Sequence, residues 1–321
     1  MNTANTDWFF IVNPHAGSGK TMSDWVPAER MIYDKGIPYV VAYTDFKRHA
    51  ISLAYGAASK GYRRILSVGG DGTLHETFNG VMEWCAETSS DPSEFTIAVA
   101  PIGSGNDWIK SLGVPHDTKK VAELLANESF GQMDVVRIEC SDTDGNNRTS
   151  CYMANCGGTG IDSHVCDKVN RQKERGFRNK LIYLNALLSS VFHLHTVSLR
   201  VVADGKEMFS GECYSIALGN GCYSGSGLRQ VPGAKIDDGL LDVTVIPKLP
   251  VLSILKEIPR LFNGTLERND RVLLFKCSEL QIIPLDESSR DIIELDGEVV
   301  GRLPARISIS GEKINVLKGC Q

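Results

Sequence analysis

Three apolar runs in the first half of the chain each end in a glycine-rich segment. They read "WFFIVNPHAGSGK" from Trp8, "RRILSVGGDGT" from Arg63 and "FTIAVAPIGSGND" from Phe95. Helical patterns follow all three, and a further apolar run, "YVVAYT" from Tyr39, lies between the first two. Strands that alternate with helices predict parallel β-α units in a doubly wound sheet, whose ligands bind at loops beyond the carboxyl ends of the strands. We therefore predict an α/β domain over residues 1–134.

The glycine-rich segments favour a nucleotide as the ligand of this domain. Glycine lets the backbone approach a ligand closely, and a helix that begins just after such a loop offers N–H groups and a positive dipole end to phosphate. Three loops of this kind at one sheet edge indicate a phosphate chain. The segment "NPHAGSGKT" is not a Walker A motif, because that motif requires glycine where Pro14 stands. Lys20 therefore does not receive the role of the Walker lysine.

The second half of the chain follows a different pattern. The stretch "VSLRVVADGKEMFSGECYSIALG" predicts a hairpin around Asp204-Gly205, and "LLDVTVIP", "RVLLFKCSELQIIP", "DIIELDGEVV" and "ARISISGEKINVL" predict further strands. Helical patterns interrupt them at 161–194 and 251–262. We predict a mostly antiparallel β-sandwich domain over 135–321, with a last strand that is able to return to the first domain. The active site is then expected in the cleft between the two domains.

Composition excludes several classes of protein. A net charge of −5 argues against broad binding of nucleic acid, which leaves a basic footprint. The nine cysteines contain no C-x-x-C pair, which excludes zinc spacing and favours a reduced compartment. The start "MNTANTDWFFIVNP" lacks the features of a signal peptide, and no run is apolar enough to span a membrane. We expect a cytoplasmic protein, able to form a homodimer, that visits the membrane surface if its substrate is a lipid.

Four segments together carry a resemblance to a known family. "NPHAGSGK", "SVGGDGTLHETFNGV", "APIGSGNDWIKSLGVP" and "GAKIDDGLLDVTVI", in this order, resemble the diacylglycerol kinase catalytic-domain family. That family includes sphingosine and ceramide kinases and bacterial soluble lipid kinases. "GGDGT" is shared with NAD kinases, whereas the other segments point to the lipid-kinase branch. The resemblance implies a Mg²⁺-dependent kinase that transfers the γ-phosphoryl group of ATP to diacylglycerol or a sphingoid-type lipid.

The resemblance also implies functional residues. The nucleotide-binding positions fall in four loops: Asn13, Pro14, Ala16, Gly17, Thr44, Gly70, Asp71, Gly72, Thr73, Leu74, His75, Glu76, Ser104, Asn106 and Asp107. Ser104 stands where the family usually has threonine, so the hydroxyl is retained.

The second half supplies the implied catalytic and metal-binding residues. Glu298, in "LDGE", matches the family's general base, and Asp296 supports metal or water or simply makes the turn. Asp238, with the carbonyl groups of Lys235 and Leu240, matches a magnesium site whose role, structural or catalytic, stays open. Asp296-Gly297 is also an ordinary hairpin-turn pair, which would make Glu298 a plain strand residue.

Two other functions remain open at this point. An NAD kinase shares "GGDGT" but fits the "NPHAGSGK" and "GSGND" segments less well. A non-catalytic nucleotide- or lipid-binding protein on the same scaffold is the second alternative, and the presence of Asp71, Asp238 and Glu298 argues against it.

Overall fold

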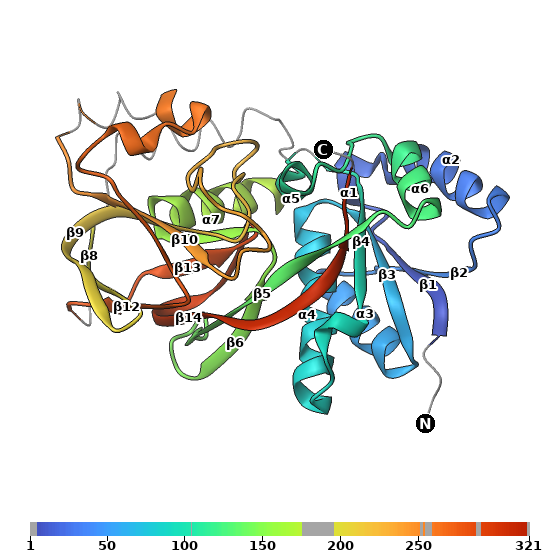
Figure 1. Cartoon of the computed structure of the whole chain (residues 1–321), viewed down its shortest axis with the longest axis horizontal. Coiled ribbons are helices and arrows are strands. Elements are labelled where there is room, and N and C mark those ends of the chain that lie inside the picture. The colour runs from blue at the N-terminus through green and yellow to red at the C-terminus, as the bar shows by residue number, and fades with distance from the viewer. Residues whose placement is uncertain are drawn as a thin grey trace. The chain divides into compact units, whose positions relative to one another are not determined.

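In a computed structural model the chain forms two compact units (Figure 1). The first comprises Met1–Val135 and Gly311–Gln321, and the second comprises Val136–Ser310. The structure describes residues 5–103, 105–174, 196–250, 253, 259–286 and 290–319. Three parts of the sequence predictions lie outside the described residues: Ser104, residues 175–194 of the predicted helical segment 161–194, and residues 251–252 and 254–258 of the predicted segment 251–262.

The first unit contains a parallel sheet. Its strand order is β2-β1-β3-β4, followed by the C-terminal end of β14. The strands are β1 (Asn5–Val12), β2 (Tyr39–Tyr43), β3 (Tyr62–Gly69), β4 (Thr96–Pro101) and β14 (Glu298–Leu317). Every residue of β4 is buried, as expected for a parallel strand that is covered on both faces.

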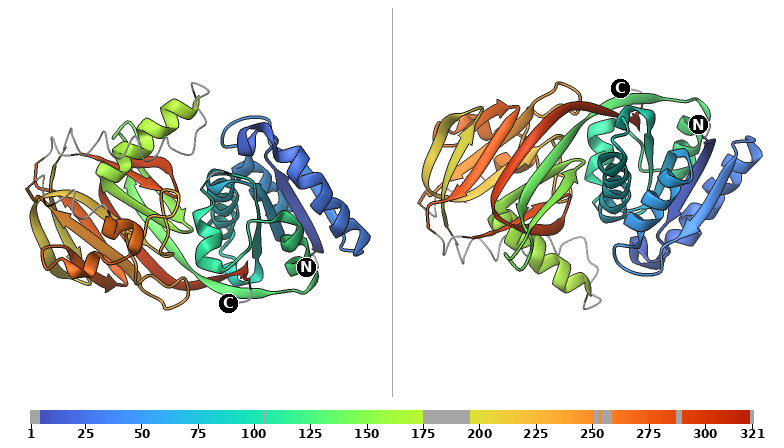
Figure 2. Two further views of the ribbon diagram at one scale, coloured as in Figure 1. Left: turned by 90° about the horizontal axis from the view of Figure 1, so that it is seen from above. Right: turned by 90° about the horizontal axis from the view of Figure 1, so that it is seen from below.

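Helices cover both faces of this sheet (Figure 2). The helix α2 (Thr21–Asp34) packs with α6 (Thr118–Ala126), and α3 (His49–Ser59) packs with α4 (Asp71–Thr88). The short helices α1 (Ala16–Gly19) and α5 (Asp107–Leu112) and a 3₁₀ turn, η1 (Pro92–Glu94), complete the unit. A Cβ atom at Gly80 of α4 would lie 2.2 Å from the carbonyl oxygen of Ile51, so only glycine permits this approach of α3 and α4. The predicted doubly wound α/β fold is confirmed.

The second unit is an antiparallel β structure. Its strands are β5 (Phe130–Ser141, shared with the first unit), β6 (Arg148–Met153), β7 (Cys156–Gly160), β8 (Val197–Ala203), β9 (Lys206–Gly219), β10 (Leu241–Pro247), β11 (Leu273–Cys277), β12 (Glu279–Pro284), β13 (Ile292–Leu295) and the first part of β14. The pairs β9-β7, β7-β13, β13-β14, β14-β12, β12-β8 and β8-β9 close into a ring. The two long strands β9 and β14 join the sheets of the sandwich, which leaves fewer open edges.

Buried aliphatic side chains fill the second unit. Residues such as Ile138, Leu199, Ile216, Leu280 and Ile307 form one continuous cluster. The helix α7 (Ile161–Glu174) packs on β7, β9 and β13, and a 3₁₀ turn, η2 (Leu266–Arg268), follows later in the chain. The predicted β-sandwich is therefore confirmed. Among the helices of the described ranges, none has the length and apolarity needed to cross a membrane.

Candidate active site

The glycine-rich loops of the first unit begin side by side. In the sheet, Val12 is paired with both Tyr43 and Val68, and Gly69 is paired with Pro101. The carboxyl ends of β2, β1, β3 and β4 therefore form one row, and the loops that follow them share one edge. This is the edge at which open α/β sheets bind ligands.

The loops after β1 and β3 are joined by a side-chain hydrogen bond. The Nδ2 of Asn13 donates to the Oγ1 of Thr73 over 3.0 Å. The Oδ1 of Asn13 accepts from the backbone N–H of His15 over 3.0 Å, and the carbonyl oxygen of Asn13 accepts from the N–H of Ala16 over 3.2 Å. Asn13 thus shapes its own loop and holds it against the first turn of α4.

The "GGDGT" segment forms the start of α4. Gly70 is the N-cap residue of this 18-residue helix and has no side chain with which to cap it. A Cβ atom at Gly69 would lie 2.5 Å from the Oγ1 of Thr73, so a side chain there would block the turn. A long helix with a glycine N-cap presents backbone N–H groups and a positive dipole end, which suits an anion. Asp71 lies in the first turn.

The "GSGND" loop lies directly against this helix start. A Cβ atom at Gly103 would lie 3.0 Å from the Cα of Gly70 and 2.7 Å from the Oδ1 of Asn106. Asn106 is buried with φ +47°, and its Nδ2 donates to the carbonyl oxygen of Gly103 over 3.1 Å and lies 2.9 Å from the Nε2 of His116. Asp107 forms a 2.6 Å ion pair with Lys110. Asn106 therefore stabilises the loop itself, and the ion pair of Asp107 lies within α5, the helix that follows.

Several predicted nucleotide residues serve the scaffold. The carboxylate of Glu76 accepts from the N–H of Arg48 (2.9 Å) and of Ala50 (3.2 Å), which caps the start of α3. Leu74 and His75 are buried. Thr44 is buried, and its N–H donates to the carbonyl oxygen of Val12 over 2.9 Å.

The remaining predicted positions lie on the loop backbone. Gly17 has φ +56°, and a Cβ atom there would lie 2.8 Å from the Cγ2 of Ile102, which brings the first and third glycine loops together. Pro14 precedes α1, Ala16 begins it, and Gly72 lies in the first turn of α4. The predicted nucleotide-binding positions that the structure describes thus lie at one edge of the sheet of the first unit.

In the second unit, Asp296 and Gly297 form a two-residue hairpin turn. Their φ angles are +53° and +88°, and the flanking residues Leu295 and Glu298 are paired across β13 and β14. Positive φ at both central residues is typical of a type I′ turn. Glu298 is half-buried as the first residue of β14.

The Asp296 carboxylate is bound by the backbone. Its Oδ2 accepts from the N–H of Ala154 over 3.0 Å, and its Oδ1 accepts from the N–H of Asn155 over 2.8 Å. The carbonyl oxygen of Gly297 accepts from the Nδ2 of Asn170, on α7, over 2.9 Å. These bonds fix the turn that carries Glu298.

Two further carboxyl groups near the turn escaped the sequence interpretation. Burial raises the pKa of Glu294 well above its ordinary value, and the charges of Asp162, Asp296 and Glu298 add to this, while a 3.0 Å hydrogen bond from the N–H of Gly297 opposes it. Burial likewise raises the pKa of Asp162, which accepts hydrogen bonds from Ser215 and, over 2.6 Å, from Gln230. Glu294 was hidden because, in "DIIELDGE", it alternates with apolar residues like any strand carboxylate.

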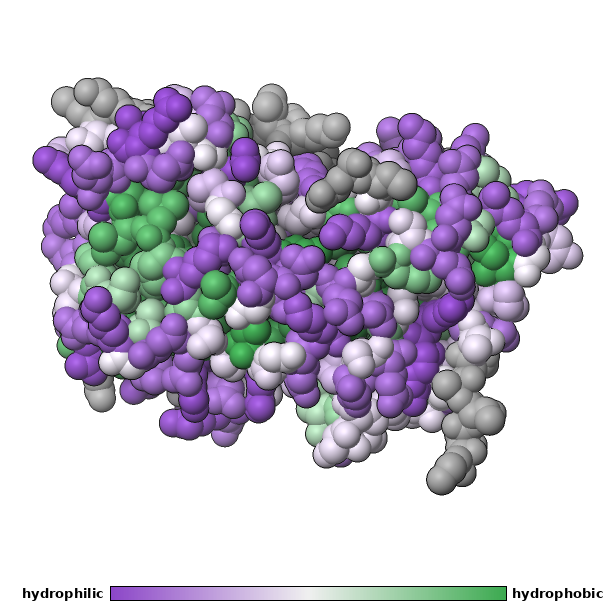
Figure 3. All heavy atoms as spheres, viewed as in Figure 1, coloured by the Kyte–Doolittle hydropathy of each residue, from purple (hydrophilic) through white to green (hydrophobic). Residues whose placement is uncertain are grey.

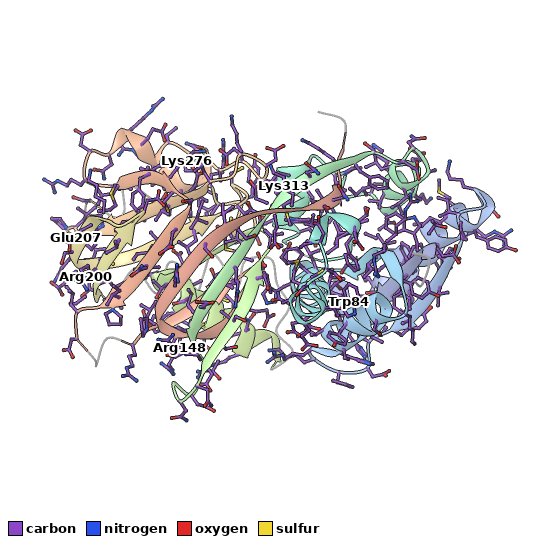
Figure 4. All side chains as sticks on the ribbon, turned by 60° about the horizontal axis from the view of Figure 1, so that its bottom comes forward. Trp84, Arg148, Arg200, Glu207, Lys276 and Lys313 are labelled. Carbon is purple, nitrogen blue, oxygen red and sulfur yellow. The ribbon has the colours of Figure 1, made fainter. Side chains whose placement is uncertain are left out.

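The predicted magnesium loop already contains a cation of the protein. Lys276, on β11 (Figure 4), places its Nζ 2.8 Å from the Oδ2 of Asp238, 3.1 Å from the Oδ2 of Asp242 and 3.2 Å from the carbonyl oxygen of Gly233. The Oδ1 of Asp238 accepts from the N–H of Leu240 over 3.2 Å. Carboxylate and carbonyl oxygens are suitable ligands for Mg²⁺. In this arrangement, however, the ammonium group of Lys276 is ion-paired with the Asp238 carboxylate. A magnesium ion does not fit beside that carboxylate unless Lys276 moves.

Burial and ion pairing act on the pKa values of Asp242 and Lys276 in this loop. Burial raises the pKa of Asp242, and the ammonium group of Lys276 partly offsets this. Burial lowers the pKa of Lys276, but its bonds to Asp238 and Asp242 outweigh that effect, so the pKa lies above the ordinary lysine value. Lys235 is exposed beside them. Within the ranges that the structure describes, no cluster of three or more His, Cys, Asp or Glu side chains is placed to hold a metal.

Two family patterns match the chain. Residues 7–138 match the diacylglycerol kinase catalytic domain, and residues 156–318 match the YegS C-terminal NAD kinase beta sandwich-like domain. A protein named diacylglycerol kinase from Mycobacterium tuberculosis is 26% identical over 309 residues, which cover 96% of this chain and 94% of the relative. A protein named probable lipid kinase YegS-like from Stenotrophomonas maltophilia is 27% identical, over 94% of this chain and 92% of that protein.

Solved structures show the same fold. A crystal structure described as a diacylglycerol kinase from Bacillus anthracis str. Sterne superposes with a TM-score of 0.68 at 22% identity. The superposition covers 99% of this chain and 98% of the chain in that crystal structure.

Proposed function

Because the chain belongs to the lipid-kinase family that joins a diacylglycerol kinase catalytic domain to a YegS-type C-terminal domain, we propose that it transfers the γ-phosphoryl group of ATP to the hydroxyl of a lipid. Diacylglycerol or a sphingoid-type lipid is the acceptor. The observation that supports this most strongly is the row of glycine-rich loops at one sheet edge, held together by the bond between Asn13 and Thr73.

In this proposal the first unit binds the phosphate chain. The backbone N–H groups at the start of α4 face the phosphates, and the dipole of the helix stabilises their negative charge. Gly70 and Gly103 let the two loops approach each other and the ligand without side chains in the way. Positioning of this kind is a large part of catalysis in phosphoryl transfer.

In the proposed reaction Glu298 is the general base. Its carboxylate takes the proton of the lipid hydroxyl, the hydroxyl oxygen forms a bond to the γ-phosphorus, and the bond from that phosphorus to the β,γ-bridging oxygen breaks to release ADP. We assign no proton transfer to Asp296, whose two oxygens accept backbone hydrogen bonds. It keeps the turn, and with it Glu298, in place.

Magnesium enters this proposal with the nucleotide. Mg²⁺ bound to ATP would offset the charge of the phosphates. The separate site at Lys235, Asp238 and Leu240 remains a prediction, and its occupation requires Lys276 to release the Asp238 carboxylate. No chemical step is assigned to it.

A lipid acceptor requires apolar surface, and we propose that the second unit provides it. Figure 3 shows hydrophobic residues gathered on the part of the surface that belongs to the β-rich second unit, whereas hydrophilic residues cover more of the α/β unit. Among the exposed large apolar side chains, Phe262, Leu274 and Leu285 belong to the second unit. In this proposal the enzyme works in the cytoplasm and binds the membrane surface transiently.

The alternative with specific support is an NAD kinase-like phosphotransferase. The family description of residues 156–318 itself refers to an NAD kinase beta sandwich. Transfer of labelled phosphate from γ-labelled ATP to a panel in detergent micelles tests both functions: diacylglycerol, monoacylglycerol, dihydrosphingosine and ceramide, with soluble NAD alongside. Label in one lipid supports the proposal. Label in NADP alone would overturn it, and ATP binding without any transfer would favour a non-catalytic binding protein.

A further inference from the structure

A pair of aromatic rings lies between the end of β2 and the first turn of α3. The ring of Phe46 is exposed, whereas the side chain of His49 is only 18% exposed. The rings of Phe46 and His49 are stacked, with centroids 4.4 Å apart and planes inclined by only 7°. Phe46 is 66% exposed, so its ring forgoes most of the free energy that burial of a phenylalanine side chain would contribute. The Nδ1 of His49 accepts a hydrogen bond from the N–H of Asp45 over 3.0 Å, which fixes the orientation of the His49 ring. One face of the Phe46 ring is thus supported, and the ring stays open to a ligand.

This pair extends the row of nucleotide loops. The strand order β4-β3-β1-β2 makes β2 the edge strand, and Val12 at the end of β1 is paired with Tyr43 at the end of β2. Neighbouring strands lie about 4.8 Å apart, so the row spans about 14 Å from the end of β4 to the end of β2. The glycine-rich loops follow β4, β3 and β1, and the aromatic pair follows β2.

The aromatic loop is also fastened to the phosphate-binding helix. The two oxygens of Glu76, in the second turn of α4, accept from the N–H groups of Arg48 and Ala50 over 2.9 and 3.2 Å. These two residues flank His49 in the sequence. The ring pair therefore has a fixed position relative to the start of α4, and Glu76 sets it.

We propose that Phe46, supported by His49, is the stacking platform for the nucleobase of ATP. The inference rests on the proposed function, since it takes the phosphate chain to lie on the glycine loops. A nucleotide laid along the row from β4 towards β2 brings its base to Phe46. Every base has a π-face, so stacking tolerates different bases, and we infer that the enzyme discriminates only weakly between ATP and GTP at this position.

Binding measurements on the full chain test this platform. The variant Phe46→Ala is compared with Phe46→Trp and with Tyr33→Ala, which removes another exposed aromatic side chain of the same unit from α2. The probes are ATP, GTP and inorganic tripolyphosphate, titrated by calorimetry. Loss of one base–aromatic stack weakens binding by roughly 5- to 100-fold. We expect this loss for ATP and GTP in Phe46→Ala, recovery in Phe46→Trp, and unchanged tripolyphosphate binding in all variants.

The outcomes separate this inference from the proposed function. ATP binding by the wild type and by Phe46→Ala with equal affinity would overturn the platform and leave the kinase proposal standing. Equal losses for ATP and tripolyphosphate in Phe46→Ala would also overturn it, because the residue would then act on the phosphates. A wild type that binds neither ATP nor tripolyphosphate would contradict the proposed function itself. Quenching of the added tryptophan of Phe46→Trp by ATP, but not by tripolyphosphate, gives an independent readout of stacking.

Discussion

The side-chain amide of Asn13 donates a 3.0 Å hydrogen bond to the hydroxyl of Thr73, sixty residues later in the chain. Asn13 follows β1, and Thr73 lies in the first turn of α4 after β3. Because β1 and β3 are neighbours in the sheet, the bond joins two loops that both belong to the proposed phosphate site. The position of one loop therefore depends on the other.

The variant Thr73→Val tests this coupling. Valine has nearly the same shape but cannot accept the bond, so Asn13 loses its partner, and we expect a loss of about 1 kcal/mol in the free energy of unfolding. We also expect ATP to bind more weakly, by up to about tenfold, since a net hydrogen-bond contribution of about 0.5–1.5 kcal/mol corresponds to a change of that size in affinity. Thr88→Val, in the last turn of the same helix, is the matched control. Wild-type ATP affinity in Thr73→Val would contradict the coupling.

The variant Glu298→Gln tests the general base. Gln keeps the size of the side chain but cannot take a proton, so kcat with the lipid is expected to fall by about 10²- to 10⁴-fold. ATP affinity and the melting temperature should stay at wild-type values. Glu207→Gln, an exposed glutamate on β9 (Figure 4), controls for the loss of a charge in the same unit. Full turnover by Glu298→Gln would require another base.

The variant Asp296→Asn separates positioning from chemistry. Asparagine accepts at only one of its two terminal atoms, so either Ala154 or Asn155 loses the acceptor of its N–H group. We expect a loss of about 1–3 kcal/mol in stability, measured by urea unfolding, because the bonds involve a charged acceptor. If Asp296→Asn unfolds like the wild type while kcat collapses, Asp296 takes part in the chemistry directly.

Glu294 predicts a specific dependence of stability on pH. Its pKa in the folded protein is raised by burial and neighbouring carboxylates, whereas the pKa of a glutamate in the unfolded chain is about 4.3. The folded state therefore holds the proton more tightly, and this residue costs stability as the pH rises above the unfolded value. Glu294→Gln should melt at a higher temperature than the wild type at neutral pH, and the difference should vanish below about pH 4.

Glu279 supplies a control of opposite sign for this experiment. Its pKa is lowered by hydrogen bonds from Arg306 and Gln281, so it contributes stability above the unfolded pKa and loses it as the pH falls. Glu279→Gln should therefore not become more stable than the wild type at neutral pH. If the melting temperatures of Glu294→Gln and the wild type depend on pH in parallel, the pKa of Glu294 is not raised in the folded protein.

The variant Lys276→Met tests the cation of the Asp238 loop. Removing the ammonium group leaves Asp238 and Asp242 without its charge, so we expect a lower melting temperature. Millimolar Mg²⁺ should restore part of the loss in Lys276→Met, because the freed carboxylate oxygens suit that ion. Lys248→Met, which removes an exposed lysine paired with Glu212, is the control. Equal responses of both variants to Mg²⁺ would show that Lys276 does not hold the place of the ion.

Some features of the molecule were determined by the sequence alone. The apolar runs of "WFFIV" and "FTIAVAP" required buried parallel strands, and the glycine clusters after them required loops with close backbone contacts. The pair Asp204-Gly205 required a tight hairpin. These predictions depend on local periodicity and on the conformational preferences of single residues, and both can be read along the chain.

Other features were decided only by the tertiary structure. The order of the strands set which loops lie together, and it placed Phe46 in line with the glycine loops. The partners of Asp296, the surroundings of Glu294 and the ammonium group at Asp238 all come from residues far away in the sequence. Burial and charge act through space, so the pKa of a carboxyl group and the occupant of a loop depend on neighbours that sequence spacing does not specify.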